Sequence, residues 1–152
     1  MINNRLEIKN LAISFFSGFA GLFAYWFVIV IVEFPDIPFR FFIYGALVEE
    51  ILKFSIILIL VLLFKINPLS TIVLGVGYGF AEEISHFWYP DGDAGLIALW
   101  MHLIVGIVMT LLIVKAFKLK SKLYFALALL VPIALHGFYN SHLLYVIVYL
   151  MP

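Results

Sequence analysis

Long apolar runs separated by short polar stretches organise the chain. Five segments have about 20 mostly apolar residues each, the length that an α-helix needs to cross the hydrocarbon core of a bilayer. They are residues 11–32, 41–64, 68–89, 94–114 and 123–151. The connections are short, so we predict an all-α, polytopic membrane bundle of about five transmembrane helices, forming a single transmembrane domain over residues 1–152. Pro132, inside the last segment, is expected to kink or break its helix.

Basic residues in the short connections predict the orientation. Arg5 and Lys9 precede the first segment, and Lys65 follows the second. Four more lysines lie between the fourth and fifth segments: Lys115, Lys118, Lys120 and Lys122. Because short cytoplasmic loops are enriched in Lys and Arg, we expect a cytoplasmic N-terminus in a multi-pass protein of a prokaryotic plasma membrane. Only Arg40 departs from this pattern.

Composition supports the membrane class and narrows the chemistry. Of the 152 residues, 66% are hydrophobic and 12% are charged, whereas a soluble domain has about 25% charged residues. The formal net charge is zero and no long basic run is present, so we expect a lipid bilayer and no nucleic acid as partner. The chain has no cysteine, which excludes disulfides, zinc–thiolate sites and cysteine nucleophiles.

Polar side chains interrupt four of the apolar segments. Ionisable residues inside membrane helices are rare and usually face the interior of a bundle. The set is Glu49, Glu50, Lys53, Glu82, Glu83, His86, His102, His136, Asn140 and His142. Although neighbouring helices run in opposite directions, these residues fall in one layer from the middle to the outer half of the membrane. We therefore predict one shared polar site, with His142 at the interface outside it.

Helical spacing decides which of these side chains share a face. Glu49 and Lys53 are four residues apart, as are His136 and Asn140, so each pair stacks on one face. Glu50 lies about 100° around its helix from Glu49. Lys53 is interpreted as the neutralising partner of these two carboxylates.

The chemistry open to such a layer is limited. Carboxylates and imidazoles activate water as general bases, or they bind a metal. A histidine and an asparagine one turn apart can donate to a developing oxyanion. The residues therefore favour hydrolysis of an amide by glutamate-activated water.

Glycines precede the carboxylates of the third segment. Gly75, Gly77 and Gly79 lie in the run Gly75-Val76-Gly77-Tyr78-Gly79. Because small residues let helix backbones approach closely in membranes, we expect this run to bring the third helix close to a neighbour.

Four motifs, one on each of consecutive segments, carry a family resemblance. Residues 49–53 read E-E-x-x-K, residues 77–82 form an aromatic, Gly/Ala-rich motif ending in Glu, His102 is a lone histidine, and residues 136–140 read H-G-x-x-N. In this order they resemble the PrsW family of intramembrane proteases. That family is related to the CAAX prenyl protease and bacteriocin-processing (CPBP) superfamily. The resemblance runs from Ala46 to Asn140.

The resemblance implies a glutamate-dependent endopeptidase without a cofactor, acting on transmembrane or membrane-anchored proteins. It makes Glu49 the base that activates water, with Glu50 shaping the site. Glu82 and His102 hold the water or the substrate carbonyl by the same analogy. The resemblance also implies that His136 and Asn140 stabilise the oxyanion.

The chain departs from the family pattern at two positions. Glu83 stands where the family often has asparagine, and His86 has no counterpart expected in PrsW. The wider superfamily uses a histidine in this motif, so the water-holding residue stays open among Glu82, Glu83 and His86.

Other functions fit the same residues. Glu and His from several helices can ligate Zn²⁺ or Fe²⁺, and Glu83 and His86 have an E-x-x-H spacing. Carboxylates and histidines at one depth also suit a proton relay or an ion-binding transporter. An inactive relative acting as a chaperone or immunity factor is a further alternative. For Glu49, His102 and His136, a purely structural hydrogen-bond network is the alternative to catalysis.

Overall fold

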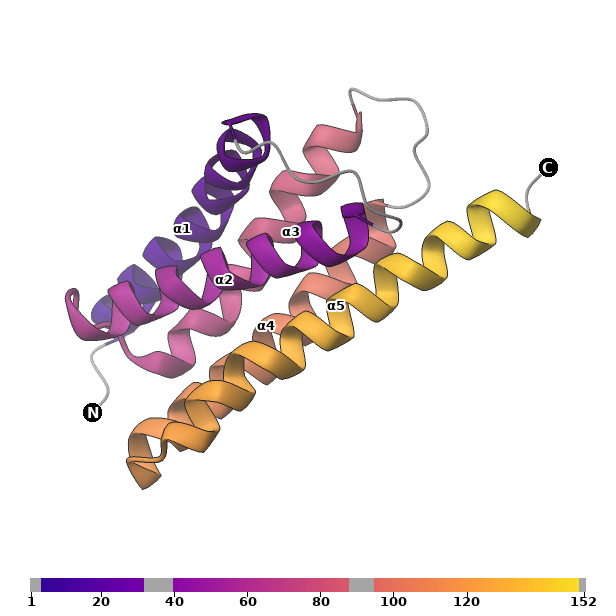
Figure 1. Ribbon diagram of the computed structural model, residues 1–152. Helices are drawn as coiled ribbons and strands as arrows, with labels where there is room; N and C mark the ends of the chain where they lie inside the picture. The colour runs from indigo at the N-terminus through magenta and orange to yellow at the C-terminus, as the bar shows by residue number, and fades with distance from the viewer. Residues whose placement is uncertain (1–3, 32–39, 88–94, 151–152) are drawn as a thin grey trace.

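Helices account for nearly all of the residues that the structure describes. The computed structural model describes residues 4–31, 40–87 and 95–150. They form the helices α1 (Asn4–Ile31), α2 (Arg40–Leu62), η1 (Pro68–Thr71), α3 (Ile72–Phe87), α4 (Gly95–Leu119) and α5 (Lys122–Leu150). Within these ranges there is no β-strand (Figure 1). The all-α prediction is confirmed.

The helices match the predicted segments with four differences. α1 begins at Asn4, seven residues before the predicted start at residue 11. The third segment is divided between η1 and α3, where Pro68 opens the short helix and Asn67 caps it through its side chain. The fourth helix extends to Leu119, beyond the predicted end at residue 114. The fifth helix continues through Pro132 without a break, so the one ladder hydrogen bond that proline removes does not end it.

Three helices are long and apolar enough to span a membrane. Among the described residues these stretches are Arg5–Ile31, Ile97–Leu119 and Lys122–Ser141. α2 carries three ionisable residues in its middle, and α3 has only 16 residues. Sixteen residues of α-helix are about 24 Å long, less than the hydrocarbon core of about 30 Å.

The helix contacts close a ring. α3 packs between α1 and α4, α5 packs between α4 and α2, and α2 returns to α1. Figure 1 shows α4 and α5 as a long antiparallel pair, with α1 on the far side of the molecule. α2 and α3 touch only slightly across the middle. Side chains that point inward from α2, α3, α4 and α5 therefore meet in the centre.

Exposure is distributed as in a protein surrounded by lipid. On the outside, α1 exposes Phe16 and Phe27, each with 67% of its surface accessible, and α5 exposes Phe138. In the centre, Lys53 and His102 are fully buried. A soluble protein buries its large apolar side chains and keeps lysine at the surface. The exposed phenylalanines and the buried lysine agree with the three apolar helices.

Two lysines in left-handed backbone conformation mark helix ends. Lys65 follows α2 with φ 57°, and Lys120 follows α4 with φ 50°. A residue in this conformation is a common helix terminator. After Lys120 the amide of Ser121 donates back to the carbonyl of Ala116, and α5 begins at once.

Gly75 and Gly77 hold α3 against its two neighbours, as predicted for the glycine run. A Cβ atom at Gly75 would collide with the backbone carbonyl of His102 on α4. A Cβ atom at Gly77 would collide with the carbonyl of Phe15 on α1. The backbones are therefore too close for any other residue, and this approach sets the distance between α3 and His102.

We predict that Gly75→Ala destabilises the protein by about 1–3 kcal/mol, the usual cost of overpacking, because the methyl group must push α3 away from α4. The control is Gly137→Ala, whose Cβ would meet Ala46 at an ordinary 4.0 Å. That change gains helix propensity of about 0.5–1 kcal/mol. Thermal unfolding in detergent micelles measures both, and equal stability of the two variants would contradict the close approach.

Candidate functional site

Four helices deliver polar side chains to the centre of the ring. In α2 the spacing of three and four residues turns both glutamates and the lysine toward the same interior region. α3 adds Glu82 and, one turn earlier, Tyr78. The remaining two groups are histidines of α4 and α5. We define the central cluster as Glu49, Glu50, Lys53, Tyr78, Glu82, His102 and His136.

The ammonium of Lys53 joins α2 to α4. Its Nζ donates to Glu50 Oε1 at 2.6 Å and lies 2.8 Å from His102 Nδ1. It is also 3.7 Å from Glu49 Oε2 and 4.3 Å from the centre of the Tyr78 ring. An ammonium donates hydrogen bonds and accepts none, so His102 Nδ1 is the acceptor and carries no proton.

His102 is engaged on both sides of its ring. With Nδ1 accepting from Lys53, its proton resides on Nε2, which donates to Glu82 Oε2. The ring also packs on Tyr78, with centroids 5.1 Å apart. A contact between His102 and a water or a substrate carbonyl would require one of these two hydrogen bonds to open. His102 thus links the acids of α2 and α3.

Glu50 is the most firmly held carboxylate of the central cluster. Its Oε1 accepts from Lys53 and from His136 Nδ1, the latter at 2.7 Å. The side chain has no accessible surface. Removing a carboxylate from water is expensive unless a counter-charge and hydrogen bonds compensate, and Lys53 and His136 supply both.

Glu49 is held much more loosely than Glu50. Its Oε2 lies 3.7 Å from Lys53 Nζ and 3.9 Å from His136 Nδ1, both longer than a hydrogen bond. That oxygen is buried and has no hydrogen-bond partner among the described residues. Glu49 therefore lies beside the hydrogen-bonded network, and its Oε2 can accept a hydrogen bond from a bound molecule.

Two other predicted site residues, Asn140 and Glu83, are not part of the hydrogen bonds and ion pairs that define the central cluster. Asn140 is partly buried on α5, one turn beyond His136, and none of its hydrogen bonds reaches a described side chain of the cluster. Glu83 has a buried Oε2 without a hydrogen-bond partner among the described residues. His86 belongs to α3 and His142 to α5, but their side chains lie outside the described part of the chain.

Tyr78 contributes more to the site than sequence analysis indicated. It is completely buried, between Lys53 and His102, and its hydroxyl has no hydrogen-bond partner within the described ranges. In the sequence, its position one helical turn before Glu82 was the feature that could have placed Tyr78 at the site. A neutral hydroxyl group beside a buried charge network is a donor that a bound molecule can use.

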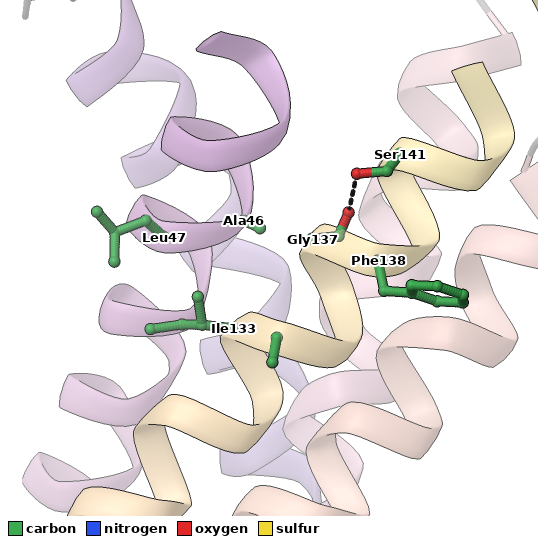
Figure 2. A pocket seen from close by; sticks show the side chains of 7 residues that line it. Ala46, Leu47, Ile133, Gly137, Phe138 and Ser141 are labelled. Carbon is green, nitrogen blue, oxygen red and sulfur yellow. Dashed lines mark hydrogen bonds between the residues drawn. The ribbon is translucent and has the colours of Figure 1, made fainter. Parts of the chain in front are cut away.

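An apolar groove runs along the same α2–α5 interface. Figure 2 shows Ala46 and Leu47 of α2 facing Ile133 and Gly137 of α5, with Phe138 and Ser141 farther along. Its volume is about 240 Å³. The Ser141 hydroxyl donates to the carbonyl of Gly137, so it is already paired within its own helix. No residue of the central cluster lines this groove.

Four residues of the central cluster have the side chains to bind a metal ion. One ligand atom from each of Glu49, Glu50, His102 and His136 lies within 4.8 Å of the others, and all four residues are buried. Carboxylate oxygens and imidazole nitrogens are common zinc ligands. The Lys53 ammonium lies within 3.7 Å of ligand atoms of Glu49, Glu50 and His102.

Fold and site together define a helical protein with membrane-spanning features and a buried acid–base cluster. No protein-family model, no curated protein and no solved structure matches the chain. The resemblance to PrsW proteases therefore rests on the four sequence motifs.

The different environments of the two glutamates predict different effects on stability. Glu50→Gln should cost about 3 kcal/mol, the lower end of the range for breaking a buried ion pair, because Lys53 loses its closest counter-charge. Glu49→Gln should cost much less, since Glu49 Oε2 has no hydrogen-bond partner in the described part of the chain. Chemical or thermal unfolding of the two variants provides the comparison. A loss as large for Glu49→Gln as for Glu50→Gln would refute the assignment.

Proposed function

We propose that the protein is an intramembrane endopeptidase that hydrolyses peptide bonds with water activated by Glu49. The observation that carries the proposal is the contrast between the two adjacent glutamates: Glu50 is fixed by two hydrogen bonds, whereas Glu49 Oε2 has no hydrogen-bond partner among the described residues. A general base needs a lone pair that can reach its substrate water. The resemblance of the motifs to PrsW proteases supports the same residue.

The proposed reaction begins when a Glu49 oxygen takes a proton from water. The water oxygen forms a bond to the carbonyl carbon of the scissile peptide, and the carbonyl electrons move onto its oxygen. When this tetrahedral intermediate collapses, the C–N bond breaks and the proton held by Glu49 passes to the departing amine. The products are a carboxylic acid and an amine, and Glu49 returns to its ionised form.

Neighbouring residues would stabilise the oxyanion of that intermediate. Glu50 holds His136 by Nδ1, which leaves Nε2 on the opposite edge of the ring for the substrate. In the doubly protonated imidazole, Nε2 would donate to the oxyanion, and the Asn140 amide one turn along α5 would supply a second donor. Because His102 is engaged by Lys53 and Glu82, we assign it to positioning these groups.

The surroundings of the site favour a membrane-embedded substrate. The described helices expose large apolar side chains around the bundle, and the groove between α2 and α5 is lined almost entirely by apolar residues. We propose the five-span topology with a cytoplasmic N-terminus in a prokaryotic plasma membrane. The substrate would be a transmembrane or membrane-anchored protein.

The hydrogen-bond network around Lys53 does not have the donor and acceptor order that a proton relay needs. A relay must pass a proton from donor to acceptor at every step, but Lys53 donates in both directions, to Glu50 and to His102. An ammonium has no lone pair with which to accept. A proton could cross this point only if Lys53 first lost one of its own.

The test is cleavage of single-span reporter proteins by the purified protein in lipid vesicles. Glu49→Gln should lower the rate by about 10²–10⁴-fold, the usual contribution of a general base. Glu7→Gln is the matched control, since Glu7 is an exposed acid at the start of α1. The same cleavage sequence in a water-soluble peptide should be a poor substrate. Full activity of Glu49→Gln would rule out Glu49 as the base.

A further inference from the structure

We infer that the four metal-ligand-type side chains at the centre form a cation site whose cation is the protein's own Lys53 ammonium, and that removing this side chain converts the site into one for a divalent transition metal. The inference concerns binding alone. It can be tested without a substrate, and it holds or fails independently of the proposed protease activity.

The ligand set itself is of the kind that binds zinc. Glu49, Glu50, His102 and His136 come from three different helices, and all are buried. Two carboxylates and two imidazoles are a normal first coordination shell for Zn²⁺ or Co²⁺. The ring centroids of the two histidines are 5.3 Å apart, so the two imidazoles are close enough to belong to one site.

Lys53 already occupies the position between these ligands. Its Nζ is 2.6 Å from Glu50 Oε1, 2.8 Å from His102 Nδ1 and 3.7 Å from Glu49 Oε2. His136 joins the arrangement through Glu50 Oε1, which accepts from its Nδ1. A metal ion bound by Glu50 and His102 would have to displace an ammonium that is itself fully buried and doubly hydrogen-bonded.

The spacing of the ligand atoms is compatible with an ammonium or with a metal ion. Tetrahedral ligands about 2.0–2.2 Å from zinc lie about 3.3–3.6 Å from one another. Acceptors about 2.6–2.9 Å from an ammonium nitrogen lie about 4.2–4.7 Å apart. The four candidate atoms lie within 4.8 Å of one another, close enough to gather around either cation, and the ammonium is the cation already hydrogen-bonded to Glu50 and His102.

The site also has more negative than positive charge, so a divalent cation would compensate it more fully than Lys53 does. Lys53 contributes one positive charge to two carboxylates, and Glu49 Oε2 and Glu50 Oε2 are both buried without hydrogen-bond partners among the described residues. A divalent ion would compensate both carboxylates and could use these oxygens. Shortening residue 53 would vacate the space and remove the repelling charge together.

Cobalt binding to the purified full-length protein tests the inference. Bound Co²⁺ is measured by its visible absorption and by metal analysis after removal of free ion. Wild type should bind no Co²⁺ at the central cluster. Lys53→Ala should bind it stoichiometrically, and Lys53→Ala with His136→Ala, which has one ligand fewer, should bind it more weakly. Lys53→Met is the matched control, because it removes the charge but still fills the space, and it should bind no metal.

A second variant covers the case in which Lys53→Ala does not fold. Lys53→Ala combined with Glu49→Gln keeps the formal charge of the site at minus one, as in wild type, and retains Glu50, His102 and His136 as ligands. It should also bind Co²⁺. Stoichiometric Co²⁺ in wild type that is lost in His136→Ala would overturn the inference, as would the absence of Co²⁺ from every folded variant that lacks Lys53.

Discussion

The structure depends on the buried ammonium of Lys53. It holds Glu50 of its own helix and His102 of α4 at hydrogen-bond distance. Through His102 it reaches Glu82 of α3, and through Glu50 it reaches His136 of α5. A charge so deeply buried is tolerated only when it is paired and hydrogen-bonded. One side chain therefore connects four helices.

The packing of the helices and the chemistry of the site are consequences of the same arrangement. Gly75 brings the backbone of α3 against that of α4 at His102 itself, which places Glu82 within reach of that histidine. With Glu50, His102 and Lys53 committed to each other, Glu49 remains as the loosely held carboxylate. The network that stabilises the interior is thus also what leaves one acid available for reaction.

Much of this could be predicted from sequence because the relevant patterns are local. The apolar runs predicted the helices, and the glycine run predicted the close approach of α3 to a neighbour. Because charged residues are rare in membrane helices, the ionisable residues within the apolar segments could be recognised as candidates for one site. Hydrogen-bond partners depend on the ring order of the helices, which no local pattern contains. The Lys53–His102 contact, the burial of Tyr78 and the contrast between Glu49 and Glu50 therefore needed the structure. Pro132 was expected to kink or break α5, and the helix continues through it without a break.

The most direct test of the account is nitrogen NMR of the protein in lipid bilayers, with ¹⁵N in the lysine side chains and histidine rings. We predict one lysine ammonium that is shielded from exchange with water and close in space to an unprotonated histidine Nδ1. In Lys53→Met the signal of this ammonium should be lost and the signal of the histidine Nδ1 should shift. The other described lysines are exposed and serve as internal references. If every lysine ammonium exchanges rapidly, or if the proton of His102 resides on Nδ1, the central role of Lys53 is contradicted.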